Sequence, residues 1–304
     1  PEFMNLQSSF LFVQNFNLFN LSSTLSNQVF NTLIIIMLAT ILVCFIVGEL
    51  TRNFSQVDKI WSLIPLVYSW VVYAAFPNSP RILLMTLLVT AWGLRLTYNF
   101  SRKGGYNIIP WKGEEDYRWN ILRQSPLLKK PLMTSLFNLL FIAIFQNILI
   151  LLFTSPIIIA AENSNVSLNY VDFLAAGFMF LFIIIETISD NQLFKFHLQK
   201  QNKMAWDGKY QNSLSKGFMV DGFWKYVRHP NFAAEQAIWI SFYFFSVAAS
   251  GEWFNWSILG MILLVLLFEG SSRFTETISS GKYAEYENYK QKVPKFIPIF
   301  FKSK

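Results

Sequence analysis

Seven runs of mainly apolar residues, separated by polar loops, constrain this chain more than any other feature. A helix needs about 20 such residues to cross a bilayer. The second and seventh runs are short, which leaves six or eight spans as alternatives. The pattern predicts an all-α, polytopic integral membrane protein with about seven transmembrane helices. The runs cover about Val29–Leu50, Ile60–Phe76, Ile82–Phe100, Pro131–Ile159, Tyr170–Ser189, Asn231–Ala249 and Trp256–Glu269.

The composition agrees with this class and excludes several others. Only 14% of the residues are charged and 18% are aromatic, whereas soluble domains carry about 25% charged residues and disordered chains are poor in aromatics. One cysteine, Cys44, and two histidines cannot form a disulfide scaffold or a four-ligand zinc site. We therefore expect no metal. The net charge of +7 does not predict nucleic-acid binding, which needs a basic soluble face.

The basic residues indicate the orientation. All but Arg81 and Arg95 of the 25 Lys and Arg residues lie in four regions: 51–59, 101–130, 190–230 and the tail from 270. With seven spans, these regions fall on one side of the membrane. Basic loops favour the cytosol, so we expect an outside amino terminus and a cytosolic, helical carboxyl-terminal tail. The membrane would be a bacterial inner membrane or the endoplasmic reticulum.

Three parts follow from this pattern. Residues 1–28 are interpreted as a tag scar, Pro1-Glu2-Phe3 before Met4, and a polar-aromatic lead-in. Residues 29–130 contain the amino-terminal spans and a basic cytosolic loop, the expected substrate side. Residues 131–304 contain the remaining spans, the second long loop and the tail, the expected cofactor-binding part.

Polar residues, most of them ionisable, lie at helical spacing at the ends of three spans. Glu186 and Asp190 are four residues apart, as are Asn231 and Glu235, so each pair shares one face of a helix. Glu269, Arg273 and Glu276 continue this spacing at the last span. Such residues are costly in lipid and mark functional sites by default. They predict a polar cavity open to the cytosol, and a structural ion-pair network is the alternative.

The densest cluster of polar and aromatic residues precedes the sixth span. Arg228, His229 and Asn231 surround Pro230, a residue suited to the first turn of a helix. The amino-terminal end of that helix offers free N–H groups to an anion, and Arg228 could clamp a phosphate or carboxylate. The alternative is structural: aromatics in the interface belt and an arginine that reaches the headgroups.

The run Asp221-Gly-Phe-Trp-Lys-Tyr-Val-Arg-His-Pro-Asn-Phe-Ala-Ala-Glu235 resembles the carboxyl-terminal signature of the steroid 5-alpha-reductase-like membrane enzymes. The branch it is most similar to carries the domain of unknown function 1295. The resemblance covers nearly all of 30–300. Further matching pieces are Val57-Asp-Lys-Ile-Trp-Ser62, Trp92-Gly-Leu-Arg-Leu96, Gly113-Glu-Glu-Asp-Tyr-Arg-Trp119, Ser189-Asp-Asn-Gln192, Tyr283-Ala-Glu-Tyr-Glu-Asn-Tyr289 and Phe296-Ile-Pro298.

The resemblance implies a reductase that uses NADPH to reduce a carbon–carbon double bond in a steroid or other lipid. Asp190, Tyr226, Asn231 and Glu235 match polar positions of the family's cofactor site, whereas Glu186 stands where the steroid enzymes have asparagine. Because Gly-x-Gly-x-x-Gly is absent, the cofactor would bind between helices. The expected cofactor-binding residues are Glu186, Asp190, Lys195, Trp224, Tyr226, Arg228, His229, Asn231, Glu235, Arg273, Tyr283 and Tyr286. In the tail, Tyr283, Tyr286 and Lys290 form a face that could close over the cofactor or pack the tail at the interface.

Arg-His-Pro-Asn also occurs in isoprenylcysteine and phospholipid methyltransferases, which use S-adenosylmethionine. A lipid or isoprenylcysteine-type methyltransferase is therefore the alternative function, and a transporter or membrane scaffold is the third. Glu235 favours the reductase, because it stands where the resemblance implies an acid in reductases. The expected partners are a lipid or steroid substrate and membrane lipids; the sequence predicts no nucleic acid and identifies no protein partner.

The proton donor does not carry over from the steroid reductases. Leu63 and Trp92 stand at the positions of their catalytic glutamate and tyrosine, and neither can protonate a substrate. Asp58 and Tyr98, at the ends of the second and third spans nearest the cytosol, are the candidate catalytic residues. The alternative is that Asp58 caps its helix and Tyr98 anchors in the interface.

Overall fold

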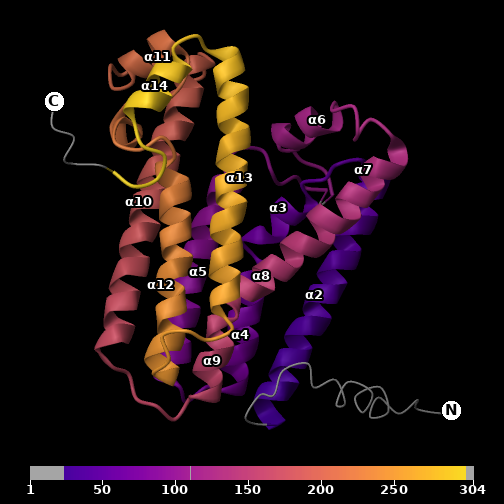
Figure 1. The fold of residues 1–304 in the computed structure, drawn as a ribbon, viewed down its shortest axis with the longest axis vertical. Helices are drawn as coiled ribbons and strands as arrows, with labels where there is room; N and C mark the ends of the chain where they lie inside the picture. The colour runs from indigo at the N-terminus through magenta and orange to yellow at the C-terminus, as the bar shows by residue number, and fades with distance from the viewer. Residues whose placement is uncertain (1–23, 110, 299–304) are drawn as a thin grey trace. The chain divides into compact units, whose positions relative to one another are not determined.

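The computed structural model describes residues 24–109 and 111–298, and this part of the chain is helical, with loops and no strand (Figure 1). These helices confirm an all-α, multi-pass membrane protein. The count of seven spans and the cytosolic carboxyl terminus stay predictions. The scar and most of the lead-in, residues 1–23, lie outside the described residues. Among the described residues, six stretches are long and apolar enough to cross a membrane: Thr24–Thr51, Pro80–Arg102, Pro131–Thr154, Tyr170–Lys200, Pro230–Ser250 and Ile258–Lys282.

The predicted second span is two helices rather than one. Helix α3 covers Gln56–Trp61 and helix α4 covers Ile64–Ala75. Pro65 lies in the first turn of α4, where it has no N–H to donate to the preceding turn. The 12 residues of α4 extend about 18 Å, which is shorter than the hydrocarbon core of about 30 Å.

The predicted fourth span is also interrupted. It consists of α7 (Pro131–Phe137), the π-helix η1 (Asn138–Phe145), α8 (Gln146–Thr154) and, after Ser155, α9 (Pro156–Glu162). Pro156 cannot donate to the carbonyl of Leu152. Gly260 packs against that carbonyl so closely that a Cβ would lie 2.1 Å from its oxygen.

The chain divides into two compact units, each described by itself. Unit 1 extends to Asp172 and includes Phe244–Gly260; unit 2 contains Phe173–Tyr243 and the chain from Met261 onward. These units do not follow the boundary expected after residue 130. The functional division into a substrate part and a cofactor part stays a prediction.

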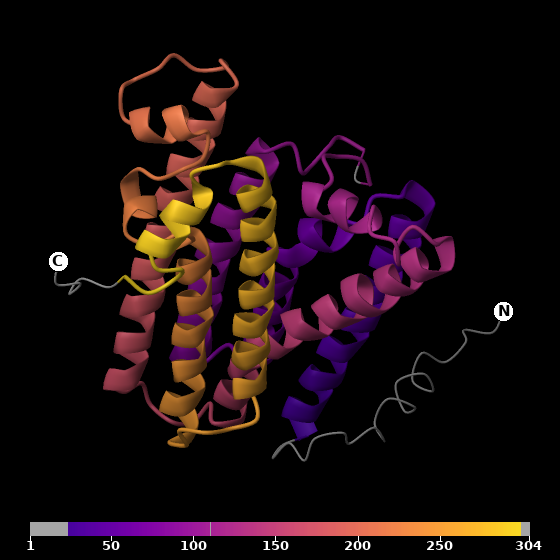
Figure 2. The ribbon, with the colours of Figure 1, turned by 45° about the horizontal axis from the view of Figure 1, so that its top comes forward.

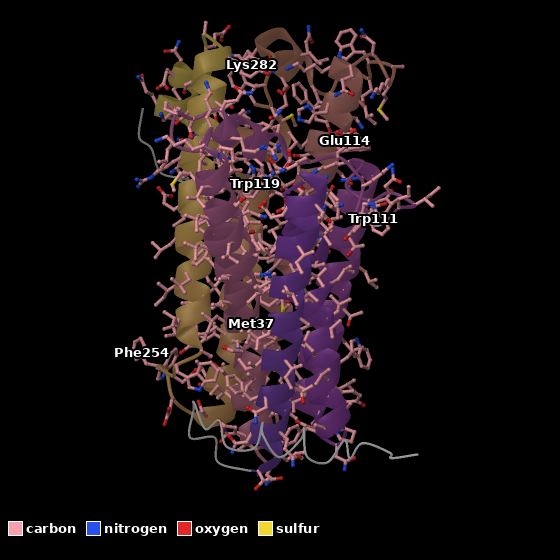
Figure 3. The ribbon with its side chains drawn as sticks, turned by 90° about the vertical axis from the view of Figure 1, so that its right-hand side faces the viewer. Met37, Trp111, Glu114, Trp119, Phe254 and Lys282 are labelled. Carbon is pink, nitrogen blue, oxygen red and sulfur yellow. The ribbon has the colours of Figure 1, made fainter. Side chains whose placement is uncertain are left out.

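In unit 1, α2 (Thr24–Thr51) packs against η1 and α8, and α4 packs against α5 (Pro80–Arg102). The loop that contains α6 (Tyr117–Arg123) folds onto the segment after α2: the Phe54 N–H donates to Glu115 Oε1 at 2.7 Å, and the Asp116 N–H donates to Ser55 Oγ at 2.9 Å. Figure 3 shows Trp111, Glu114 and Trp119 toward the same end of this unit. The loop thus anchors one end of the amino-terminal helices.

A buried ion pair joins α5 to the start of α10 (Tyr170–Lys200) within unit 1. Arg81 donates from Nε to Asp172 Oδ1 at 2.7 Å and from Nη2 to Oδ2 at 2.8 Å. Its guanidinium also donates to the carbonyls of Val166 and Ser167. Both side chains are at most 1% exposed. Arg81, which lies apart from the basic regions, is therefore a structural residue.

In unit 2, α10 and α13 (Ile258–Lys282) are longer than predicted. The 31 residues of α10 extend about 46 Å, so the helix exceeds a hydrocarbon core of about 30 Å. Helix α11 (Gln211–Lys216), the 3-10 helix η2 (Gly222–Lys225) and α14 (Tyr286–Lys292) gather at the end of unit 2 where α10 and α13 finish (Figures 1 and 2). We call residues 190–229 and 270–298 the polar cap. Helix α12 (Pro230–Ser250) begins at Pro230, which confirms the predicted helix start.

Candidate functional site

All twelve predicted cofactor-binding residues lie in unit 2. They come from α10, from the segment 224–235 and from the end of α13 with the tail. The two candidate proton donors, Asp58 and Tyr98, lie in unit 1. Unit 2 therefore contains every residue for which the sequence predicted a cofactor contact.

Arg228 and His229 share one carboxylate. Arg228 Nε donates to Glu276 Oε1 at 2.7 Å, and His229 Nε2 lies 2.9 Å from the same oxygen. Arg228, His229 and Glu276 are all buried. The sequence placed Glu276 on one helix face with Glu269 and Arg273 and offered two interpretations, a polar cavity or a structural ion-pair network. The contacts of Glu276 fit the ion-pair network.

The same two residues hold the carboxyl-terminal tail. Arg228 Nη1 donates to the carbonyls of Lys290, at 2.8 Å, and Val293. The backbone N–H groups of Arg228 and His229 donate to the carbonyls of Pro294 and Lys295, at 2.9 and 3.2 Å. We call Arg228, His229, Glu276 and 290–295 the tail clamp. The sequence predicted a guanidinium open to an anion, whereas the structure places it between a carboxylate and the tail.

A second polar group joins α10 to α12. Asn231 Nδ2 donates to Asp190 Oδ1 at 3.3 Å. Glu186, one turn before Asp190, is buried, and so is Glu235, whose Oε1 accepts from Trp239 Nε1 at 3.1 Å. The Asp190 and Asn231 faces of these two helices therefore contact each other, and the polar cavity expected there stays a prediction.

Two of the buried polar atoms that have no hydrogen-bond partner among residues 24–109 and 111–298 come from the segment 224–231. They are Nε1 of Trp224, a donor, and Oδ1 of Asn231, an acceptor. A buried polar atom without a partner costs about 1–3 kcal/mol, so a ligand that supplied the missing partners would be stabilised. The Trp224 ring lies 6.5 Å from that of His229, which connects this tryptophan to the tail clamp.

The aromatic residues of the tail pack inside unit 2. Tyr286 and Tyr289 are buried against Phe218, and Tyr289 Oη donates to the carbonyl of Trp224. Lys200 Nζ donates to Tyr283 Oη at 2.9 Å. Burial disfavours ionisation of Tyr283, but this hydrogen bond and the charges of Lys200 and Lys282 outweigh it and lower its pKa. The stripe thus packs the tail onto unit 2 through Tyr286.

Three predicted residues are accessible. Lys195 is exposed on α10, and Tyr226 is 53% exposed. Arg273 is exposed on α13 and donates to Glu269 Oε1 at 2.7 Å. Within the described ranges, no group of three or more His, Cys, Asp or Glu residues is placed to hold a metal ion. Of these three residues, Lys195 and Arg273 are the cations that an anionic ligand could reach in unit 2.

Asp58 and Tyr98 have contrasting environments in unit 1. Asp58 Oδ2 accepts from Trp119 Nε1 at 3.0 Å; burial raises its pKa, and the nearby charge of Asp116 adds to this effect. Tyr98 is 66% exposed, and the guanidinium carbon of Arg102 lies 5.5 Å from its ring centre. Sequence reasoning missed the Asp58–Trp119 bond, although both residues lie in motifs that carry the family resemblance.

The comparisons with known proteins agree with the part of the resemblance that concerns the family. The family described as protein of unknown function (DUF1295) matches residues 44–293. A Schizosaccharomyces pombe protein described as uncharacterized is 38% identical over 277 residues, which cover 85% of this chain and 78% of the yeast protein. No solved structure matches significantly. The chain therefore belongs to the DUF1295 family.

Proposed function

We propose that the chain is an NADPH-dependent reductase of a carbon–carbon double bond in a steroid or another lipid, with the cofactor held by unit 2. The observation that carries the proposal is the pair of buried atoms without partners, Trp224 Nε1 and Asn231 Oδ1. Asn231 bonds Asp190 on α10, and the ring of Trp224 lies beside His229 of the tail clamp. A buried donor and a buried acceptor within the same unit suit a polar ligand with both kinds of group.

The chemistry of a nicotinamide dinucleotide fits these groups. Its carboxamide and ribose hydroxyls can donate to Asn231 Oδ1, and its carbonyl or phosphate oxygens can accept from Trp224 Nε1. The phosphates need cations, and Lys195, Lys225 and Arg273 are exposed in the same unit. NADPH, when bound, would supply the hydride. The remaining tasks of the protein would be to position the lipid and to deliver a proton.

Arg228 would act on the cofactor through the tail. Its guanidinium already bonds Glu276 and the carbonyls of the tail, so it has few free donors for a phosphate. A buried charge network of this kind fixes the position of the segments it joins. Loss of Arg228 should therefore disturb a cofactor site by releasing 290–295 rather than by removing a direct contact.

A methyltransferase that uses S-adenosylmethionine is the second candidate. Glu186, Asp190 and Glu235 place three buried carboxyl groups in unit 2. Carboxylates favour cationic ligands, and S-adenosylmethionine carries a sulfonium and an ammonium group. A thermal-shift measurement with the ligands of both enzyme classes distinguishes the methyltransferase from the reductase.

The experiment is a thermal-shift measurement on the purified protein in detergent. NADPH, NADH, S-adenosylmethionine and S-adenosylhomocysteine are added separately. A ligand at one hundred times its dissociation constant stabilises the folded state by about 2.7 kcal/mol. We expect NADPH to raise the melting temperature most. Stabilisation by S-adenosylmethionine and S-adenosylhomocysteine alone would contradict the proposed reductase and support the methyltransferase.

A further inference from the structure

Unit 1 contains a cavity of about 320 Å³ that the proposed reductase does not use. Three of its six lining residues are cationic and none is acidic. The apolar and neutral lining comes from a phenylalanine, a proline and a threonine. The lining residues are Arg52, Phe54, Arg123, Lys129, Pro131 and Thr134.

Contacts within unit 1 hold Arg123 in place. Its guanidinium carbon lies 4.9 Å from the centre of the Phe54 ring, and Nη1 donates to the carbonyl of Arg52 at 2.9 Å. Its Nη2 is paired with Glu115. These contacts leave Nε and further N–H groups of a five-donor guanidinium available. Arg123 is therefore a pre-positioned cation on an aromatic surface.

The backbone of Arg52 is unusual. This residue follows the end of α2 with a φ of 55°, the left-handed conformation in which many helices end, although glycine usually occupies that position. It directs the Arg52 carbonyl to Arg123. Its side chain is 64% exposed and lies 3.3 Å from Glu49, so the charge stays accessible.

Lys129 supplies the third cation. It is exposed, and no acidic partner of its ammonium group is recorded within 24–109 and 111–298. The cavity lies where α2 ends and α7 begins, at Thr51 and Pro131. Both helices belong to candidate membrane spans, so these ends should lie at the level of the lipid headgroups.

We propose that this cavity binds a phosphate group, supplied by an anionic lipid headgroup. Arginine forks match phosphate oxygens, and a lysine adds a point charge. Exposed Leu132 directly follows Pro131, and exposed Leu127 is two positions before Lys129; both suit contact with acyl chains. Phosphate could also come from a free anion, and the experiment distinguishes the two sources. None of the six lining residues belongs to the predicted cofactor set.

The test measures binding of a fluorescent phosphatidate to the purified protein in neutral detergent. Lys129→Gln is compared with Lys130→Gln, which removes the same charge from the next exposed residue, one that does not line the cavity. Arg52→Gln is the second variant. We expect Lys129→Gln and Arg52→Gln to weaken binding by about tenfold, the effect of one lost charge-assisted contact. Lys130→Gln should change it by less than about twofold, as a surface charge does.

Two competitors identify the source of the phosphate. Unlabelled phosphatidate should displace the probe, whereas phosphatidylcholine and inorganic phosphate should not. Displacement by inorganic phosphate at low concentration would retain the phosphate site but overturn the lipid as its source. The proposal fails if neither Lys129→Gln nor Arg52→Gln binds more weakly than Lys130→Gln. NADPH affinity should be the same in all three variants, so this outcome does not depend on the proposed function.

Discussion

Asp58 and Trp119 are 61 positions apart, yet one hydrogen bond of 3.0 Å joins them. The sequence identified Asp58 as an ionisable residue next to an apolar run, but periodicity carries no signal for a partner so far along the chain. The loop that brings Trp119 to Asp58 is held by bonds such as that from Asp116 to Ser55. The environment of this carboxyl group thus depends on tertiary structure.

Our first prediction concerns the charge of Asp58. Its folded-state pKa lies above the unfolded value of about 3.9. Between the two values the folded state binds more protons, so stability falls as pH rises through this interval. Asp58→Asn keeps an acceptor for Trp119 but removes the charge. Melting temperatures measured from pH 4 upward should show that the stability of the variant, relative to that of the parent, increases as pH rises. A difference in melting temperature that does not change with pH would contradict the shifted pKa.

The same variant tests the role of Asp58 as a proton donor. If Asp58 or Tyr98 supplies the proton, Asp58→Asn with Tyr98→Phe should abolish turnover and leave NADPH binding intact. Full turnover in the double variant, on any substrate that the parent reduces, would remove both residues from the mechanism.

A second residue-scale prediction concerns Gly222 in the polar cap. Its φ is +64°, and a Cβ would lie 2.4 Å from Gln192 Oε1. Gly208 has a similar φ of +78° but no atom within 4 Å of the Cβ position. Gly208→Ala should therefore cost only the backbone strain, about 1–2 kcal/mol. Gly222→Ala should cost more in thermal or denaturant unfolding, because Gln192 must also move. Equal losses would show that the contact is unimportant.

At the scale of helices, the tail clamp explains how a short segment stays on unit 2. Helix α14 has 7 residues, too few to be stable alone. Buried Tyr286 and Tyr289 attach it to Phe218. Arg228 bonds the carbonyl of Lys290 in its last turn and that of Val293 directly after it. The spacing of the tyrosines predicted one face, but the buried position of that face required the structure.

Arg228→Ala should release this segment. We expect faster hydrogen exchange across 286–298 and NADPH binding weakened by about tenfold, because a bond to a charged group contributes about 1.5–3 kcal/mol. Lys292→Ala, an exposed change on the same helix, should leave both quantities near the parent values. Unchanged exchange in Arg228→Ala would mean that the clamp does not hold the tail.

The interrupted helices show what a hydropathy pattern cannot resolve. Apolar runs predicted helices over 60–76 and 131–159. The structure has interrupted helices over 56–75 and 131–162, and Pro65 and Pro156 lie at the two breaks. A proline inside an apolar run can kink a helix or end it, so the sequence alone did not distinguish these outcomes. The π-helical turns of Asn138–Phe145 depend on packing and have no such sequence signal.

At the scale of the whole chain, composition and apolar runs were sufficient to predict an all-α membrane protein. The cofactor candidates, which came from the family resemblance and from the spacing of polar residues, all fall within one compact unit. The Arg81–Asp172 pair could not be predicted, because a lone arginine in a short loop is usually solvated. Its burial follows from the carbonyls of Val166 and Ser167, which satisfy the remaining donors.

The topology is open to cysteine labelling. Cys44, the single cysteine, is buried, and Cys44→Ser supplies a clean background. Asn165→Cys and Lys203→Cys introduce thiols at exposed positions in two loops. An impermeant maleimide added to intact cells should label Asn165→Cys only, because positive-inside loops face the cytosol. Labelling of Lys203→Cys alone would show that the orientation is opposite to the predicted one.

The dissociation constant of NADPH, measured for the parent and three variants, tests the central claim most directly. Asn231→Ala and Trp224→Phe remove Oδ1 of Asn231 and the N–H of Trp224, two buried atoms without a hydrogen-bond partner in the described chain, and Asn288→Ala is a matched change at an exposed position. We predict about tenfold weaker binding for the first two, as expected for a lost hydrogen bond in a buried site, and parent-like binding for Asn288→Ala. A parent that does not bind NADPH, or equal binding by all four proteins, would contradict the account.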